Sequence, residues 1–157
     1  MSMFDPIAND LSERFGTHIT GNASGFFCVI SASSLTDEEQ VALSGSANAL
    51  GFGGVRKFGD QTDNFTHVTF CAADGTRLSP QDLILIVETI DPLVVVVTSK
   101  EAGKAIADAY HQQVALDSVQ ALLGRPMLCF DNLASMLIST DGKQHAWKLL
   151  KALAQKQ

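Results

Sequence analysis

Short runs that are apolar at every position alternate along the chain with segments whose apolar residues repeat every three or four positions. Continuous apolar runs of this length are typical of strands buried on both faces of a parallel sheet. Four runs predict strands, over residues 26–30, 65–71, 93–97 and 127–130. The four successive valines of the third run suit a pleated strand and suit a helix poorly, so we expect this strand at the centre of the sheet.

The segments between these strands carry the start and stop signals of helices. Asp5-Pro6 and Ser79-Pro80 each place a proline directly after a capping residue, and Thr36 precedes Glu39 with the spacing of a capping box. Helices are therefore predicted over residues 5–15, 36–50, 79–90, 98–110, 117–123 and 145–157. The glycine-rich stretch 51–64 is predicted to be a loop, with a short extended piece at 54–58.

Alternation of strands and helices predicts an α/β fold. Strands that are apolar on both faces favour a three-layer α/β/α domain with a short, about four-stranded, mainly parallel sheet between two helical layers. The connections between its parallel strands are expected to be right-handed. No internal repeat, low-complexity segment or linker divides the chain. Residues 1–157 are therefore interpreted as a single domain.

Charge and apolar content change the expected partners. Only 18% of the residues are charged against about 25% in an average domain, and 46% are apolar, which favours self-association such as a homodimer. The formal net charge of −6 opposes the phosphate neutralisation on which nucleic-acid binding depends, so such binding would need a local basic patch. The most apolar stretch, 83–97, is interrupted by Glu88, Asp91 and Pro92 and is too short to cross a membrane.

The three cysteines, Cys28, Cys71 and Cys129, each lie inside an apolar run and are far apart in the sequence. No pair of them, and no histidine near them, has the spacing of a metal site. We interpret them as buried structural thiols and expect no metal and no cofactor. Unpaired thiols and the lack of a secretory signal at the N-terminus together favour a cytoplasmic location.

The residues that follow the predicted strands are the candidates for a ligand site, because ligands of open parallel sheets bind outside the carboxyl ends of the strands. The six candidates are Ser31, Ser33, Thr98, Ser99, Asp131 and Asn132. The same residue types also cap helices and turns, so both interpretations stay open. The sequence does not identify catalytic residues, because it lacks a G-x-S-x-G elbow and its histidines are not gathered at these strand ends.

Three segments carry a family resemblance. ETIDPLVVVVTSKEAGKAIADAY, FDNLASMLISTDGKQHAWKLLKAL and CVISASSLTDEE are similar to the strand and helix segments of the uracil-DNA glycosylase superfamily. The resemblance is distant and implies a four-stranded parallel sheet between helices. The family's glycine- and proline-rich first loop is replaced by residues 31–34, and its His-Pro-Ser-like turn is replaced by Asp131-Asn132. The active-site motifs are therefore not retained.

This degenerate resemblance implies a non-catalytic domain. We expect it to bind a partner protein or a small ligand at the carboxyl ends of the strands. The alternative is a divergent nucleic-acid or nucleotide glycosidase, or another small-molecule enzyme, that uses Asp131 or Asp74 as its acid.

Overall fold

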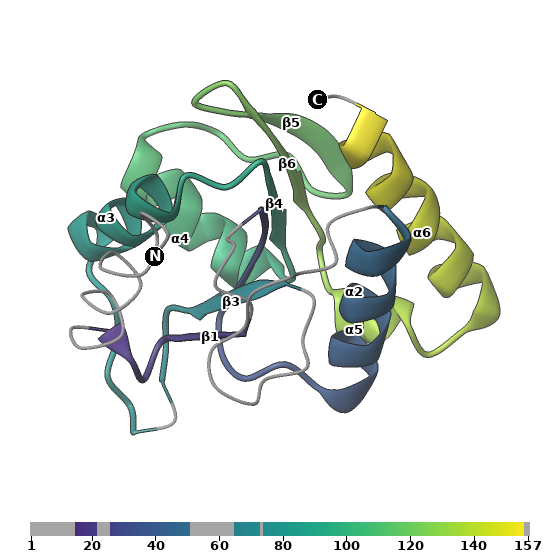
Figure 1. Cartoon of the computed structure of the whole chain (residues 1–157), viewed down its shortest axis with the longest axis horizontal. Helices are drawn as coiled ribbons and strands as arrows, with labels where there is room; N and C mark the ends of the chain where they lie inside the picture. The colour runs from purple at the N-terminus through teal and green to yellow at the C-terminus, as the bar shows by residue number, and fades with distance from the viewer. Residues whose placement is uncertain (1–14, 22–25, 51–64, 73, 156–157) are drawn as a thin grey trace, which may run out of the picture.

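The computed structural model describes residues 15–21, 26–50, 65–72 and 74–155, which form a mixed α/β structure around one sheet (Figure 1). The described strands are β1 (Ile19–Gly21), β2 (Phe27–Ser31), β3 (Thr66–Thr69), β4 (Val94–Val97), β5 (Ser118–Leu122) and β6 (Arg125–Cys129). They are arranged in the order β1-β3-β2-β4-β6-β5. The neighbours β3, β2, β4 and β6 are parallel, and β1 and β5 are antiparallel strands at the two edges.

The fold class is confirmed as α/β with a mainly parallel sheet, but the expected number of about four strands is wrong, because the described residues form six. The segment 117–123, predicted to be helical, is the edge strand β5 and forms a hairpin with β6. The turn of this hairpin consists of Leu123 and Gly124, with φ angles of 48° and 87°. Two positive φ angles are what a tight two-residue hairpin requires, and they cannot continue a helix.

The described helices are α2 (Asp37–Ala49), α3 (Pro80–Ile90), α4 (Lys100–Tyr110), α5 (Leu133–Met136) and α6 (Thr140–Gln155). The Thr36 hydroxyl accepts a hydrogen bond from the Glu39 amide at 3.1 Å, which confirms the capping box. Ser79 caps α3 in the same way, followed by its predicted proline. Helix α6 begins earlier than predicted, at Thr140. The predicted helix over 5–15, except Phe15, and the extended piece at 54–58 lie outside the described residues.

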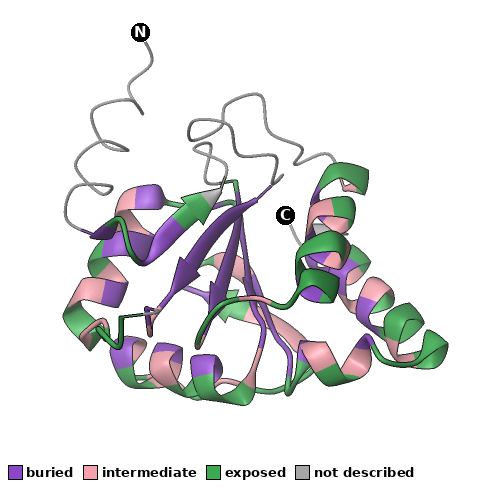
Figure 2. Ribbon diagram, turned by 90° about the horizontal axis from the view of Figure 1, so that it is seen from below, coloured by how far each residue is buried: buried purple, intermediate pink, exposed green. Residues whose placement is uncertain are grey.

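Side chains alternate between the two faces of the sheet and form two separate cores. Helices α3 and α4 pack on one face, and α2, α5 and α6 pack on the other (Figure 1). The first core contains Cys28, Ile30, Val95, Val97, Met127 and Cys129 from the sheet, and the second contains Phe27, Val29, Val94, Val96, Leu128 and Phe130. The central strands are buried along their length (Figure 2), as their continuous apolar sequences require.

A polar network ties the β5–β6 hairpin to the helices of the first face. The Arg125 guanidinium forms ion pairs with Glu88 and Asp91, each with a shortest N–O distance of 2.8 Å. The Tyr110 hydroxyl donates a hydrogen bond to the Glu88 carboxylate at 2.7 Å. Burial and the Glu88 carboxylate together raise the pKa of Tyr110, so this hydroxyl keeps its proton at neutral pH. The network therefore joins α3, α4 and the hairpin.

Candidate functional site

Strands that follow β2 in the sequence lie on both sides of it, so the strand order reverses between β2 and β4. The chain passes from β2 to β3 on one side and then crosses to β4 on the other. In open α/β sheets, a crevice that can hold a ligand lies outside the carboxyl ends of the strands at such a switch point. Ser31 ends β2 and Thr98 directly follows β4. The structure thus places these two predicted site residues at the switch point, with Asp131 and Asn132 after the neighbouring strand β6.

Two of the predicted residues use their side chains to start helices. The Ser99 hydroxyl accepts a hydrogen bond from the Ala102 amide at 3.3 Å and caps α4, and the Asn132 side chain accepts one from the Ser135 amide at 3.1 Å and caps α5. Ser99 and Asn132 also pair with each other through an isolated bridge. Their polar atoms are therefore committed to helix starts and to joining the exits of β4 and β6.

The other predicted residues differ in exposure. Thr98 is buried, with its amide bonded to the Ile30 carbonyl at 3.1 Å and its carbonyl bonded to the Leu133 amide at 3.0 Å. Ser33 and Asp131 are exposed. Of the six candidates, only these two have exposed side chains that do not cap a helix.

Ser31 is paired with a histidine that the sequence did not associate with it. The Ser31 hydroxyl oxygen lies 2.6 Å from Nε2 of His67 in β3 and donates its own hydrogen to the Ser33 carbonyl at 2.5 Å. His67 therefore donates to Ser31 through Nε2. Burial lowers the pKa of His67 to about 4, so its ring is neutral at pH 7. Because a base must accept the serine proton, this geometry suits a structural link between β2 and β3 and does not activate a nucleophile.

The two carboxylates considered as catalytic acids belong to separate parts of the sheet. Asp74 follows β3 and Asp131 follows β6, and the strands β2 and β4 lie between them. At about 4.8 Å per strand, the ends of β3 and β6 are roughly 14 Å apart. Paired catalytic carboxylates of glycosidases lie about 5 to 9.5 Å apart. Hydrogen bonds from Thr76 lower the pKa of Asp74, which favours a permanently ionised, exposed carboxylate over an acid that gives up a proton.

A groove of about 720 Å³ lies between α2, α5 and α6. One wall is a single side of α2, where Val41, Ala42, Gly45, Ser46 and Ala49 recur at helical spacing. The opposite wall belongs to α6. The floor is apolar and is formed by buried leucines, which are Leu43, Leu133, Leu137 and Leu150.

The α2 wall is low because its residues are small. A Cβ atom on Gly45 would meet no atom within 4 Å, so the space in front of this residue is open. Val41, at the rim, is 74% exposed, whereas Leu43 in the floor is fully buried. A bulky side chain from another molecule therefore has room against α2.

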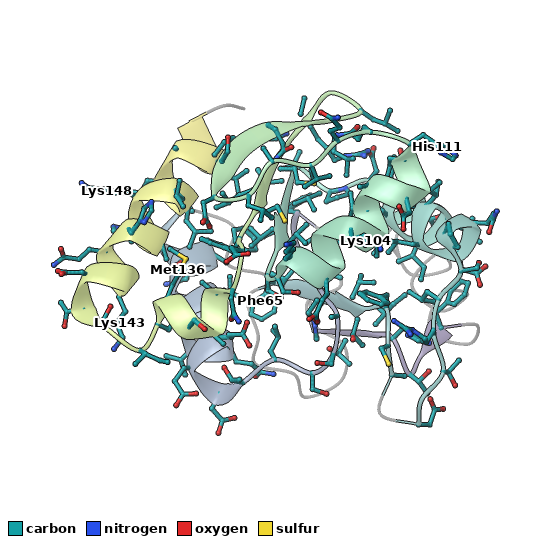
Figure 3. All side chains as sticks on the ribbon, turned by 180° about the vertical axis from the view of Figure 1, so that it is seen from behind. Phe65, Lys104, His111, Met136, Lys143 and Lys148 are labelled. Carbon is teal, nitrogen blue, oxygen red and sulfur yellow. The ribbon has the colours of Figure 1, made fainter. Side chains whose placement is uncertain are left out.

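The α6 wall is built around Trp147. The Lys151 ammonium lies 5.6 Å from the centre of the Trp147 ring and covers part of it. At the start of α6, Gly142 packs so closely on the Met136 carbonyl that a Cβ atom would overlap it, which fixes the corner between α5 and α6. Lys143 follows Gly142 in the first turn of α6 and is exposed, and Lys148 points away into solvent (Figure 3).

Charged residues line one end of the groove. Asp37 and Glu38 contribute from the first turn of α2, and Lys143 contributes from the first turn of α6. Within the described ranges, none of the three forms an ion pair. The remainder of the lining is apolar apart from Ser46. The groove is therefore apolar along most of its length and carries, among the described residues, unpaired charged side chains at one end.

The groove was not predicted from the sequence. Val41, one of the few large apolar residues of α2, lies at the exposed rim. The available signal was the composition of the helix over 37–49, in which alanine, serine and glycine outnumber large apolar residues. Such a helix cannot fill the space beside it, but sequence alone does not show which neighbour it leaves uncovered.

A scan against models of known protein families finds no match, and a search of curated protein sequences finds none. Among the residues that the structure describes, no group of histidine, cysteine and acidic side chains could hold a metal ion. No helix in the same ranges has the length and apolar content needed to cross a membrane. The candidate site rests on the geometry of this chain.

Proposed function

We propose that this chain is a non-catalytic binding domain that holds an α-helix of another protein in the groove between α2 and α6. The observation that carries the proposal is the groove itself, which has two helical walls, an apolar floor and an open side. A hydrophobic groove on a protein commonly binds the apolar face of an amphipathic helix.

The shape of the groove suits a helix. Its α2 wall runs from Asp37 to Ala49, about 18 Å at 1.5 Å per residue, which is slightly more than three helical turns. A helix that docks in a groove presents apolar anchors at positions i, i+3 or i+4, and i+7. The small residues of α2 leave room for such anchors, and Trp147 provides a large apolar contact opposite.

A small molecule fits the groove less well. The volume lies within the range of small-molecule sites, but such sites position a few polar groups to fix the orientation of the ligand. In this groove the charged groups are confined to one end, and the floor is leucine. A continuous apolar lining therefore favours an elongated partner with an apolar face, such as an amphipathic helix.

A second copy of the chain is also a poor occupant. On the described helices, the large apolar side chains that are exposed are Val41 in α2 and Leu85 in α3, too few to form the apolar face of an inserted helix. The formal net charge of −6 makes two copies repel each other and attracts a cationic partner. The homodimer expected from composition stays a prediction, for which the molar mass in solution is the test.

We further infer that the scaffold is a three-layer α/β/α domain of the uracil-DNA glycosylase type. The four parallel neighbours β3, β2, β4 and β6, with helices packed on both faces, support this inference. The use of Ser99 and Asn132 as helix caps supports the loss of catalysis, since neither side chain is directed to a substrate. Ligand binding at Ser33 and Asp131 stays a prediction.

The proposal is tested by panning a displayed library of amphipathic helical peptides against the wild-type protein. Gly45→Phe places an aromatic side chain in the groove at a position where a Cβ atom meets nothing within 4 Å, and Asn48→Phe adds the same side chain to an exposed position of α2 outside the groove. Selected peptides should bind the wild type and the Asn48 variant equally and bind the Gly45 variant at least about tenfold more weakly, a loss of roughly 1.4 kcal/mol.

Two results would overturn the proposal. One is that the selected peptides bind the Gly45→Phe variant as tightly as the wild type. The other is that no amphipathic peptide is selected while laurate, used as a small apolar probe, binds the wild type and not the Gly45→Phe variant. That second result would make the groove a small-molecule site.

A further inference from the structure

We infer that the bound helix runs antiparallel to α2 and α6 and has a basic last turn, which lies against Asp37 and Glu38. This inference rests on the proposed function, since it specifies the partner of the same groove. It follows from the placement of charge at one end of the groove and from the direction of the two walls.

Both walls begin at the charged end. Helix α2 starts after the carboxyl end of β2, and α6 starts after α5, so the two helices run in the same direction away from that edge of the sheet (Figure 1). The N-terminus of a helix carries a partial positive charge and its C-terminus a partial negative charge. A third helix is therefore favoured with its C-terminus at this end, beside two positive helix ends.

The side chains at this end favour the same direction. Asp37 and Glu38 are exposed carboxylates without an ion pair among the described residues, so they attract a cationic group that is brought to this end of the groove. Lysine and arginine are most favourable in the last turn of a helix, next to its C-terminal carbonyl groups. A basic last turn thus interacts favourably with the C-terminal carbonyl groups of the bound helix and with the carboxylates of the groove.

Lys143 completes the arrangement from the opposite wall. Its ammonium group lies at the same end of the groove, where it can meet the C-terminal carbonyl groups of the bound helix. A helix in the reverse direction would bring its amino-terminal N–H groups to Lys143 and to two positive helix ends. The partner class is therefore a basic amphipathic helix with its positive charge at the C-terminal end.

The test compares two synthetic peptides of about 14 residues, or four turns. They share the same composition and apolar face, and one carries its three basic residues in the last turn while the other carries them in the first. Binding is measured by fluorescence anisotropy at low and physiological salt. The peptide with the basic last turn should bind the wild type about tenfold more tightly, and salt should reduce the difference.

Charge reversal in the protein locates the effect. Asp37→Lys with Glu38→Lys should abolish the preference between the two peptides, and the milder pair Asp37→Asn with Glu38→Gln should reduce it. The matched control is Asp82→Lys with Glu101→Lys, which makes the same change in the first turns of α3 and α4 on the other face of the sheet. The control should leave the preference intact.

The outcomes separate the two proposals. Equal binding of both peptides, or tighter binding of the peptide with the basic first turn, would overturn the orientation, while sensitivity to Gly45→Phe would still support the groove as a helix site. A preference that survives the Asp37 and Glu38 reversal would also overturn the orientation. Failure of both peptides to bind would count against the proposed function and the orientation together.

Discussion

The two faces of the sheet are covered in different ways. On one face α3 and α4 pack directly against each other, and α3 buries four large side chains, which are Leu83, Ile86, Val87 and Ile90. On the other face α2 buries Leu43 and Ala47 together with part of its capping Glu39, and α5 lies between the starts of α2 and α6. The first face is covered more completely by its own helices, whereas the second retains the groove of about 720 Å³.

This difference shows that the helices covering a sheet decide how completely each of its faces is filled. The strands supply valines and other apolar residues to both faces, so each face has a core of its own. The face with α3 and α4 also has a hollow, but it is smaller, about 300 Å³, and is bordered by the charged residues Arg77, Glu101, Lys104 and Asp108. Helix α3 covers its face with large apolar residues, whereas the small residues of α2 leave the groove beside it open.

The largest expected effect on stability comes from a substitution in the core under α4, compared with one at the exposed rim of the groove. Ile106→Ala removes a fully buried side chain of α4 and should lower the free energy of unfolding by about 2 to 5 kcal/mol, because it leaves a cavity. Val41→Ala, at a position 74% exposed, should change it by less than about 0.5 kcal/mol. Urea denaturation measures both. A loss below about 1 kcal/mol for Ile106→Ala would contradict the tight packing of this face.

The next effect concerns pH and the face of α2, where His67 is buried beside Ser31. As pH falls below the ordinary pKa of 6.5, His67 in the unfolded chain takes up a proton, while in the folded chain it stays neutral until about pH 4. The unfolded state therefore binds more protons in this window, and stability falls as pH drops. At about 1.4 kcal/mol per pKa unit, the loss is about 3 kcal/mol.

His67→Gln is the matched variant, because glutamine keeps a neutral donor for Ser31 without a titrating ring. Between about pH 7 and pH 4 the wild type should lose roughly 3 kcal/mol more of its unfolding free energy than the variant, measured by urea denaturation. Equal losses in the two proteins would show that His67 is protonated in the folded state.

The smallest effect refines the description of the open face. Gly45→Ala should raise the free energy of unfolding by about 0.5 to 1 kcal/mol, since alanine restricts the unfolded chain and its Cβ meets nothing within 4 Å. Gly103→Ala, on the closed face, should destabilise, because its Cβ would come within 2.6 Å of the Cys129 sulfur. Thermal unfolding measures both changes, and stabilisation by Gly103→Ala would contradict the contrast between the faces.

Local signals account for the parts of the fold that were predicted. The four continuous apolar runs all form parallel strands, with bounds that differ by a few residues from those expected. Thr36 and Ser79 cap helices at the positions where the sequence indicated them. These features depend on residues within one turn or one strand, so a short stretch of sequence contains the information.

The edge strands β1 and β5 were not predicted, because their sequences lack a continuous apolar run. Strand β1 forms by pairing with β3, and β5 by pairing with β6 across the turn at Leu123 and Gly124. The candidate site was foreseen only as far as topology allows. The sequence placed Ser31 and Thr98 at the ends of central strands, but the hydrogen bond between Ser31 and His67 joins residues 36 positions apart.

The sequence by itself determined where the described helices α2, α3 and α4 begin and which four strands form the parallel part of the sheet. Capping hydrogen bonds and apolar periodicity are short-range properties of the chain. Tertiary structure alone decided that α2 stands apart from α6, that Gly45 faces open space, and that Asp37, Glu38 and Lys143 line the same groove. The physical reason is that a groove is the space between elements, and its shape depends on how distant segments pack.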